Sequence, residues 1–92
     1  MNLLTRPACR RSLKKHSPAE IAEINAAIVR LPQVLGSPHV HSGLSVRKLR
    51  PAIFELRAGL QVRVLFAREG GDLVLMFAGN HDEVRAWLKE NL

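Results

Sequence analysis

The stretch that decides the fold is Leu49–Ala78, LRPAIFELRAGLQVRVLFAREGGDLVLMFA. It contains three short apolar runs, at residues 52–58, 60–66 and 73–78. Alternate side chains of a β-strand point to opposite faces, so Phe54 and Leu56 are predicted to share one face. Glu55 and Arg57 then share the other face. The first run is therefore expected to be a strand with one apolar side and one charged side.

The second and third runs extend this strand into a meander. In the second run Arg63 alternates with Val62 and Val64, which again separates a charged face from an apolar one. The third run is apolar on both faces, which is typical of a central strand covered on both sides. Gly59 predicts the first turn, and Gly70-Gly71 predicts a tight hairpin. The stretch thus predicts an antiparallel meander whose polar stripe consists of Glu55, Arg57 and Arg63.

Two helices are predicted before the meander. Thr5 is a candidate N-cap and Pro7 fits a first helical turn, which together predict a basic helix over residues 8–15. Ser17-Pro18-Ala19-Glu20 combines capping-box spacing with proline at the first helical position. A second helix is therefore expected from Pro18 to about residue 31, where Pro32 stops or bends it. Its apolar stripe is Ile21, Ile24, Ile28 and Leu31.

The remaining segments are shorter. Residues 1–4 could form an edge strand, but they are too few for a firm prediction. Residues 37–43 are predicted to form a loop. Residues 45–50 are a candidate strand that ends at Pro51. Asn80 or His81 is expected to cap a C-terminal helix. Its apolar face would consist of Val84, Trp87 and Leu88. This helix and the 18–31 helix are both expected to pack on the apolar face of the sheet.

Composition limits the class of protein. The chain has 92 residues, the size of one domain, and 47% of them are hydrophobic, which is enough for a core. The single cysteine, Cys9, cannot form an internal disulfide, so the chain is expected to be intracellular and stabilised by packing. Its apolar runs are far shorter than the ~20 residues of a membrane span. We therefore expect a cytoplasmic protein that makes no membrane contact.

The net charge of +6 is unevenly distributed. Residues 1–16 carry five basic side chains and no acid, and residues 45–63 carry five basic side chains and one acid, Glu55. The rest of the chain is slightly acidic. Two basic blocks favour a polyanionic partner, either nucleic acid or an acidic protein. A solvated basic surface is the alternative, and charge alone does not separate the two.

Segments along nearly the whole chain carry a family resemblance. The most specific are the series KLR, FELR and VRVLF, at Lys48–Arg50, Phe54–Arg57 and 62–66, and the GNHDE entry to the last helix at Gly79–Glu83. Together with the two helices they resemble the RelE/ParE superfamily of toxins from bacterial type II toxin–antitoxin systems. The resemblance implies a single α+β domain over residues 1–92. It would have two N-terminal helices on a curved antiparallel sheet of three to four strands, a short C-terminal helix, and a cognate antitoxin as partner.

The same resemblance implies an activity. RelE-like members cleave mRNA on the ribosome without a metal, a reaction in which the 2′-hydroxyl attacks the adjacent phosphate. Arg57 and Arg63 match the family's basic positions, and they would stabilise the developing negative charge. His81 is a candidate general acid or base because histidine changes charge near neutral pH. Glu55 is a second proton-transfer candidate. The residues predicted to hold the RNA backbone are Arg47, Lys48 and Arg50.

Other functions stay open at this point. ParE-like members inhibit DNA gyrase with the same fold, and an inactive interaction module is a third possibility. The chain has no tyrosine that could stack on a base of the RNA. Trp87 is predicted either to stack on a base in its place or to be part of the core. His39 and His41, with Cys9 or His81, do not have the spacing of a characteristic metal site. No metal and no small-molecule cofactor are expected.

Overall fold

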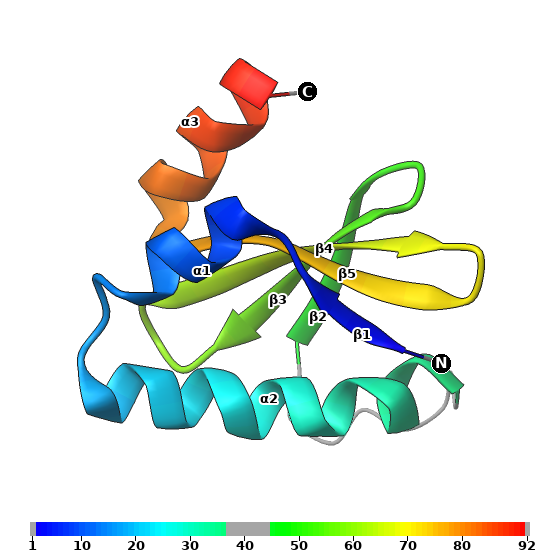
Figure 1. The fold of residues 1–92 in the computed structure, drawn as a ribbon, viewed down its shortest axis with the longest axis horizontal. Coiled ribbons are helices and arrows are strands. Elements are labelled where there is room, and N and C mark those ends of the chain that lie inside the picture. Colours follow the sequence, from blue (N-terminus) through cyan, green and yellow to red (C-terminus); the bar gives the residue numbers. More distant parts are fainter. Residues whose placement is uncertain (1, 37–44, 92) are drawn as a thin grey trace.

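The computed structural model describes residues 2–36 and 45–91. Within these residues the elements follow one another as Figure 1 shows. In order they are β1 (Leu3–Thr5), α1 (Pro7–Leu13), α2 (Pro18–Gly36), β2 (Ser45–Arg50), β3 (Ile53–Ala58), β4 (Val62–Glu69), β5 (Asp72–Gly79) and α3 (His81–Asn91). The predicted α+β class, with two N-terminal helices and a C-terminal helix, is confirmed.

The sheet has the strand order β1-β5-β4-β3-β2. The predicted antiparallel meander of β3, β4 and β5 is confirmed, as is the candidate strand at residues 45–50, which is β2 and pairs with β3. The expected three to four antiparallel strands were too few, however, because β1 pairs with β5 in parallel and places Leu3 opposite Leu73. Three residues give little strand signal of their own, and their hydrogen-bond partner is about 70 positions further along the chain. The sheet is therefore mixed and five-stranded.

A register shift in the β4–β5 pair interrupts the alternation of side chains along β5. Leu65 pairs with Phe77, but Phe66 pairs with Leu75, so Met76 is an extra residue on β5. The side chains of Met76 and Phe77 both belong to the cluster on the α3 side of the sheet, whereas Leu75 packs on the other side. The bulge thus changes which residues of β5 face each side, and strict alternation does not hold along this strand.

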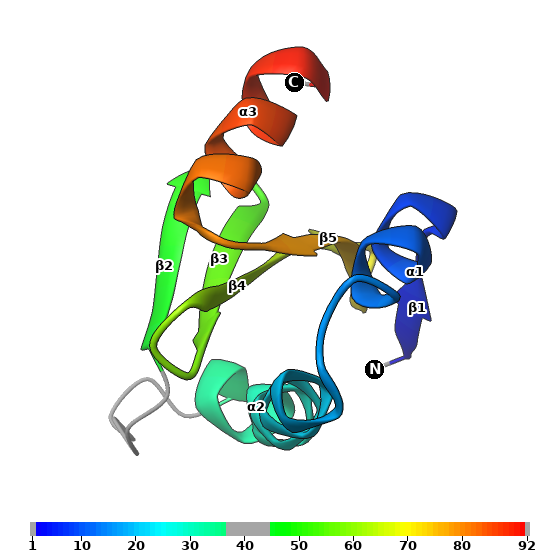
Figure 2. The ribbon, with the colours of Figure 1, turned by 90° about the vertical axis from the view of Figure 1, so that its left-hand side faces the viewer.

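The hydrophobic core is divided by the sheet into two clusters. Figure 2 shows α2 on one side of the sheet and α3 rising from the other. The cluster under α1 and α2 is built from Cys9, Ile24, Ala27, Leu31, Leu56, Ala58, Val62, Val64, Phe66, Leu73, Leu75 and Ala78. The cluster under α3 is built from Leu65, Ala67, Val74, Met76, Val84 and Leu88. The expectation that both helices pack on one face was wrong, because β4 and β5 offer apolar side chains to both faces.

The start of α2 follows its sequence signal, but its end does not. The capping box is confirmed: the Ser17 N–H donates to Glu20 Oε1 at 2.9 Å, and the Glu20 N–H donates to Ser17 Oγ at 3.2 Å. Hydrogen bonding of the Glu20 carboxylate to the backbone N–H of Ser17, and next to the Ser17 side chain, lowers the pKa of this carboxyl. The predicted end near residue 31 was wrong, because α2 continues through Pro32 to Gly36. A proline inside a helix removes one backbone hydrogen bond, a cost that packing can offset.

The first helix, α1, covers the edge of β5 that β1 leaves free. It begins after Arg6, not after the predicted cap Thr5, and it ends at Leu13, earlier than predicted. Ser12 accepts a hydrogen bond from the Ala78 N–H at 3.0 Å and donates one to the Cys9 carbonyl at 2.7 Å. The Ser12 hydroxyl thereby accepts a hydrogen bond from a buried backbone N–H of β5 on the side where no strand lies next to it.

The last helix, α3, is capped by Asn80, one of the two predicted residues. Asn80 Oδ1 accepts from the Glu83 N–H at 2.8 Å, and Glu83 Oε1 accepts from the Asn80 N–H at 3.0 Å. Val84 and Leu88 are buried against the sheet as predicted. The Trp87 ring is half-buried and stacks on Phe77 with 5.6 Å between the ring centroids. The first turn of α3 is therefore fixed relative to the end of β5.

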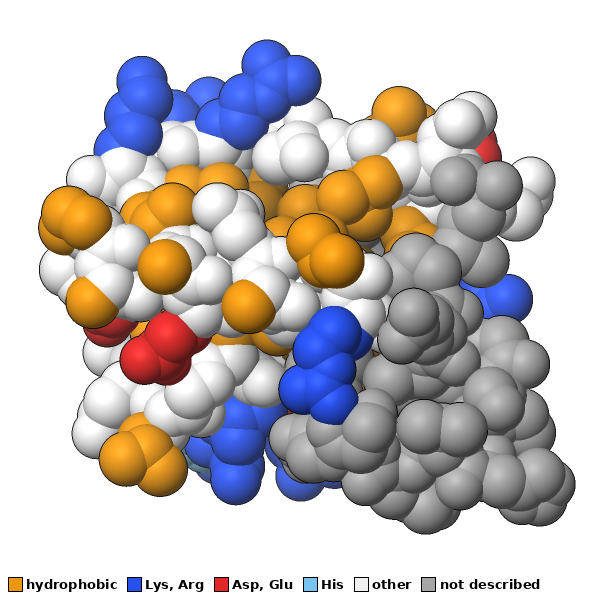
Figure 3. Space-filling model, turned by 90° about the horizontal axis from the view of Figure 1, so that it is seen from below, with side chains coloured by type: hydrophobic (Ala, Val, Ile, Leu, Met, Phe, Trp, Pro, Cys, Tyr) orange, Lys and Arg blue, Asp and Glu red, His pale blue; other side chains and the backbone are white. Residues whose placement is uncertain are grey.

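Some apolar side chains lie at the surface. Figure 3 shows hydrophobic side chains on the outer face of the molecule, along α2. Val29 on α2 is 76% exposed, and Leu60 in the β3–β4 turn is 92% exposed. Within residues 2–36 and 45–91, no helix is both long and apolar enough to cross a membrane.

The divided core yields a stability prediction. Leu75→Ala on the α2 side and Leu65→Ala on the α3 side should each lower the free energy of unfolding by about 2–5 kcal/mol, because both side chains are at most 3% exposed. Leu60→Ala is the matched control and should have almost no effect. Urea denaturation measures all three variants. If only one of the two core substitutions destabilised the protein, the second cluster would not be part of the cooperative fold.

Cys9 yields a reactivity prediction. Burial raises the pKa of its thiol to about 11, against a smaller opposite effect of the hydrogen bond with Ser12. The thiol is therefore protonated and inert at neutral pH. The pKa of the Cys9 thiol is higher in the folded protein than in the unfolded chain. The protonated thiol therefore adds stability to the folded state below the unfolded-state pKa, and that stability is lost as the pH rises toward 11. Modification by a thiol reagent at pH 8 should be as slow as global unfolding, and rapid labelling of the native protein would contradict this.

Candidate functional site

A cavity of about 230 Å³ lies at one end of the sheet, on the side of α3. It is lined by Arg47, Glu55, Arg57, Arg63 and His81. The strand register brings four of these residues together. Arg47 on β2 pairs with Glu55 on β3, and Arg57 on β3 pairs with Arg63 on β4. Residues that pair across antiparallel strands point to the same face, so the predicted polar stripe becomes one wall of the cavity.

Glu55 is the carboxylate at the centre of this cluster. It is only 8% exposed. Its Oε1 lies 3.5 Å from Arg47 Nη2 and 3.7 Å from Arg63 Nε. Burial of an unpaired carboxylate is costly, and two guanidinium groups offset that cost. Glu55 therefore holds two cations beside the cavity.

Arg63 and Arg57 carry donors for which the described residues supply no partner. The Nη1 atom of Arg63 is buried and has no hydrogen-bond partner among the described residues. Arg57 is exposed, and within the described part of the chain its side chain has no ion-pair partner. Unpaired guanidinium donors favour an anionic oxygen ligand, since a phosphate can accept several such hydrogen bonds.

His81 reaches the cavity from a different element. It is the first residue of α3, directly after the capping residue Asn80. The capping box between Asn80 and Glu83 fixes the direction in which α3 leaves β5, and His81 lines the same cavity as the arginines. An imidazole and several guanidinium groups thus lie beside one space.

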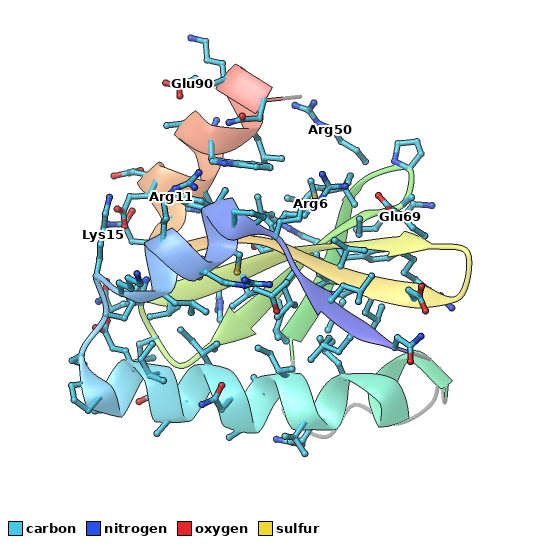
Figure 4. All side chains as sticks on the ribbon, in the orientation of Figure 1. Arg6, Arg11, Lys15, Arg50, Glu69 and Glu90 are labelled. Carbon is cyan, nitrogen blue, oxygen red and sulfur yellow. The ribbon has the colours of Figure 1, made fainter. Side chains whose placement is uncertain are left out.

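The other predicted residues are distributed differently. Arg47, which was predicted only to hold the RNA backbone, lines the cavity itself. Its pairing with Glu55 could not be read from the sequence without the strand register. Lys48 pairs with Phe54, so it lies on the opposite face of the sheet. Arg50 is the last residue of β2, next to the β2–β3 connection (Figure 4), and it does not line the cavity. The RNA-binding roles of all three residues stay predictions.

The metal site considered from the sequence has little support in the geometry. His39 and His41 lie outside the described residues. Cys9 is fully buried in the core under α1 and α2. Across the described residues, no three side chains of His, Cys, Asp or Glu gather closely enough to hold a metal ion.

Comparison with known proteins identifies the fold. No protein-family model matches the sequence, and no curated protein matches it. The structure is similar to the RelB-RelE antitoxin-toxin complex from Methanococcus jannaschii, with 13% identity and a TM-score of 0.68 over 91% of this chain and 96% of that one. It is also similar to a copper-bound mutant toxin from Helicobacter pylori, with 15% identity and a TM-score of 0.71 over 91% and 98% of the two chains.

A third solved structure agrees with these two. YafQ from E. coli has 7% identity to this chain and a TM-score of 0.69, over 90% of this chain and 96% of YafQ. Each of the three matched chains is covered almost completely. At such low identity the likeness concerns backbone arrangement, and it shows that this chain has the RelE-like toxin fold.

Proposed function

We propose that this protein is the toxin of a type II toxin–antitoxin system and a metal-independent endoribonuclease that cleaves mRNA on the ribosome and so inhibits translation. The observation that carries the proposal is the cavity lined by three arginines, Glu55 and His81, in which Glu55 pairs with Arg47 and Arg63. The fold supports the toxin part of the proposal, because the similar solved structures include an antitoxin-toxin complex and a further toxin. Fold alone does not decide an activity, so the argument depends on the chemistry of these side chains.

In the proposed reaction the 2′-hydroxyl of the RNA loses its proton and attacks the adjacent phosphorus atom. The bond from phosphorus to the 5′-oxygen then breaks, and that oxygen takes up a proton. Negative charge builds up on the phosphate oxygens in between. Arg57 and the unpaired Nη1 of Arg63 are suited to stabilise this charge. His81 is the proposed general acid or base.

Glu55 is better suited to positioning than to proton transfer. It lies within 3.7 Å of Arg63 Nε and 3.5 Å of Arg47 Nη2, and it is buried. Accepting a proton would neutralise the carboxylate and weaken both ion pairs. We therefore infer that Glu55 orients the arginines, and that the earlier assignment of Glu55 as a proton donor or acceptor is the weaker alternative.

The proposed partners follow from the same assignment. Two of the similar solved structures are toxin–antitoxin complexes, from Methanococcus jannaschii and Mycobacterium tuberculosis. We propose that this protein acts in the cytoplasm. Its partner there would be a cognate antitoxin, and the targets of the toxin itself would be the ribosome and mRNA. The formal net charge of +6 is consistent with a partner that is an acidic protein or an RNA.

Arg57 provides the cleaner test of charge stabilisation, because its removal breaks no ion pair with Glu55. Arg57→Ala should slow mRNA cleavage by about 10²–10³-fold, measured by primer extension on mRNA from translating ribosomes. Arg68→Ala, near the far end of β4 and on the opposite face of the sheet, is the matched control and should cleave at nearly the wild-type rate. If the wild-type protein left mRNA intact but inhibited gyrase supercoiling, the nuclease proposal would fail in favour of a ParE-like activity.

The proton-transfer role of His81 has its own test. Glutamine keeps a hydrogen-bonding side chain of similar size but does not exchange a proton near neutral pH. His81→Gln should therefore abolish one limb of the pH–rate profile of cleavage in addition to lowering the rate. An equal loss of rate at every pH would show that His81 only binds the substrate.

A further inference from the structure

A second cavity, of about 550 Å³, forms a groove between α2 and the β3–β4 turn. Figure 1 shows this turn next to the first half of α2. The α2 groove shares one lining residue, Arg57, with the arginine cavity around Glu55. Arg57 lies near the end of β3, where the sheet gives way to the turn. A ligand that binds in the arginine cavity can therefore extend past Arg57 into the α2 groove.

The floor of the α2 groove is apolar and fixed. Ala27 of α2 and Ala58 of β3 both line it, and they are only 6% and 2% exposed. Leu60 in the turn also lines the groove, although its side chain is almost fully exposed. A flat apolar ring that entered the groove would cover Leu60, and removal of this apolar surface from water is favourable.

Two carboxylates, those of Glu20 and Glu23, border the groove. Oε1 of Glu20 is already used, because it accepts the hydrogen bond from the Ser17 N–H. Glu23 has no hydrogen-bond or ion-pair partner among the described residues. Its carboxylate lies against the turn, since Gly59 has a φ of +76° and a Cβ atom there would collide with it. Glu23 therefore presents two unused acceptor oxygens beside the groove.

These carboxylates decide which part of an RNA the groove suits. They would repel a phosphate or an acidic peptide, but an uncharged base can donate hydrogen bonds to them. Guanine presents two adjacent donors, N1–H and N2–H, which match the two oxygens of one carboxylate. The Watson–Crick edges of adenine, cytosine and uracil place each donor next to an acceptor, which a carboxylate would repel. The chemistry of the groove therefore favours guanine.

We propose that the α2 groove binds a guanine base of RNA while a phosphate next to it lies in the arginine cavity, and that Glu23 recognises this base. The inference rests on the proposed function, because it takes RNA as the ligand. Leu60 would contact the face of the base, and Arg57 would contact the phosphate. Single-stranded RNA is suited to such recognition, since its unstacked bases expose their Watson–Crick edges. The bonds that the protein cleaves would then lie next to guanine.

The probe for this inference is guanosine 3′,5′-bisphosphate, which carries a phosphate on either side of its nucleoside. Inosine 3′,5′-bisphosphate is the matched ligand, because it lacks only the N2 amino group. In calorimetric titration of the intact protein, the guanosine compound should bind about tenfold more tightly, as expected for one hydrogen bond to a charged group. This readout is binding of a small ligand, so it does not depend on whether the protein cleaves mRNA.

Two variants of equal charge test the assignment of Glu23. Glu23→Gln keeps the size of the side chain but replaces one acceptor oxygen with a donor, and it should bind the two bisphosphates with nearly equal affinity. Glu90→Gln, near the far end of α3 (Figure 4), is the control and should keep the tenfold preference. Guanine should also be enriched beside the mRNA bonds that the wild type and Glu90→Gln cleave, but not beside those that Glu23→Gln cleaves.

Several outcomes would overturn the inference. They are equal affinity of the wild type for the two bisphosphates, binding of neither, and a preference for guanosine that Glu23→Gln retains. Preferential binding together with cleavage at sites without guanine would exclude the role in RNA recognition and assign the groove to a free guanine nucleotide. A preference for guanosine in a protein that did not cleave mRNA would instead refute the proposed nuclease and leave the guanine site in place.

Discussion

The constraint on which the rest of the structure depends is the burial of β4 and β5 on both faces. A strand that is apolar on only one side would have allowed all three helices to pack together and would have left the other face in water. Here the two central strands need cover on both sides, and α2 and α3 provide it from opposite directions. At the end of the sheet where α3 begins, the α3-side face changes from apolar to charged. The arginine cavity lies at that point.

Charge at this end of the sheet is balanced around one buried carboxylate. Three arginines on one face would repel one another, and Glu55 reduces that repulsion while remaining almost inaccessible to solvent. The balance is incomplete, because Arg57 and one nitrogen of Arg63 have no internal partner among the described residues. A site that is positive but already ordered has a low reorganisation cost when an anion enters, which is the condition under which fixed charges stabilise a transition state.

Local patterns in the sequence were sufficient for the meander, the capping box of α2 and the face shared by Arg57 and Arg63. Each of these depends on residues within a few positions of one another, where period and cap chemistry act directly. The parallel pairing of β1, the β5 bulge at Met76 and the continuation of α2 past Pro32 were not predictable in this way. They depend on tertiary contacts that compensate for weak or unfavourable local signals. For the same reason the sequence did not separate Arg47, inside the cavity, from Lys48, one residue later on the other face.

The helix α3 links the arginine cavity to the core. Its first residue, His81, lines the cavity, and Trp87, further along the helix, stacks on Phe77 of β5. The capping box at Asn80 and the buried side chains of Val84 and Leu88 fix both positions relative to the same strand. A shift of α3 large enough to move Trp87 from Phe77 would therefore also move His81 relative to the arginines. Catalytic geometry tolerates such displacements poorly, so the position of this one helix determines whether the cavity is complete.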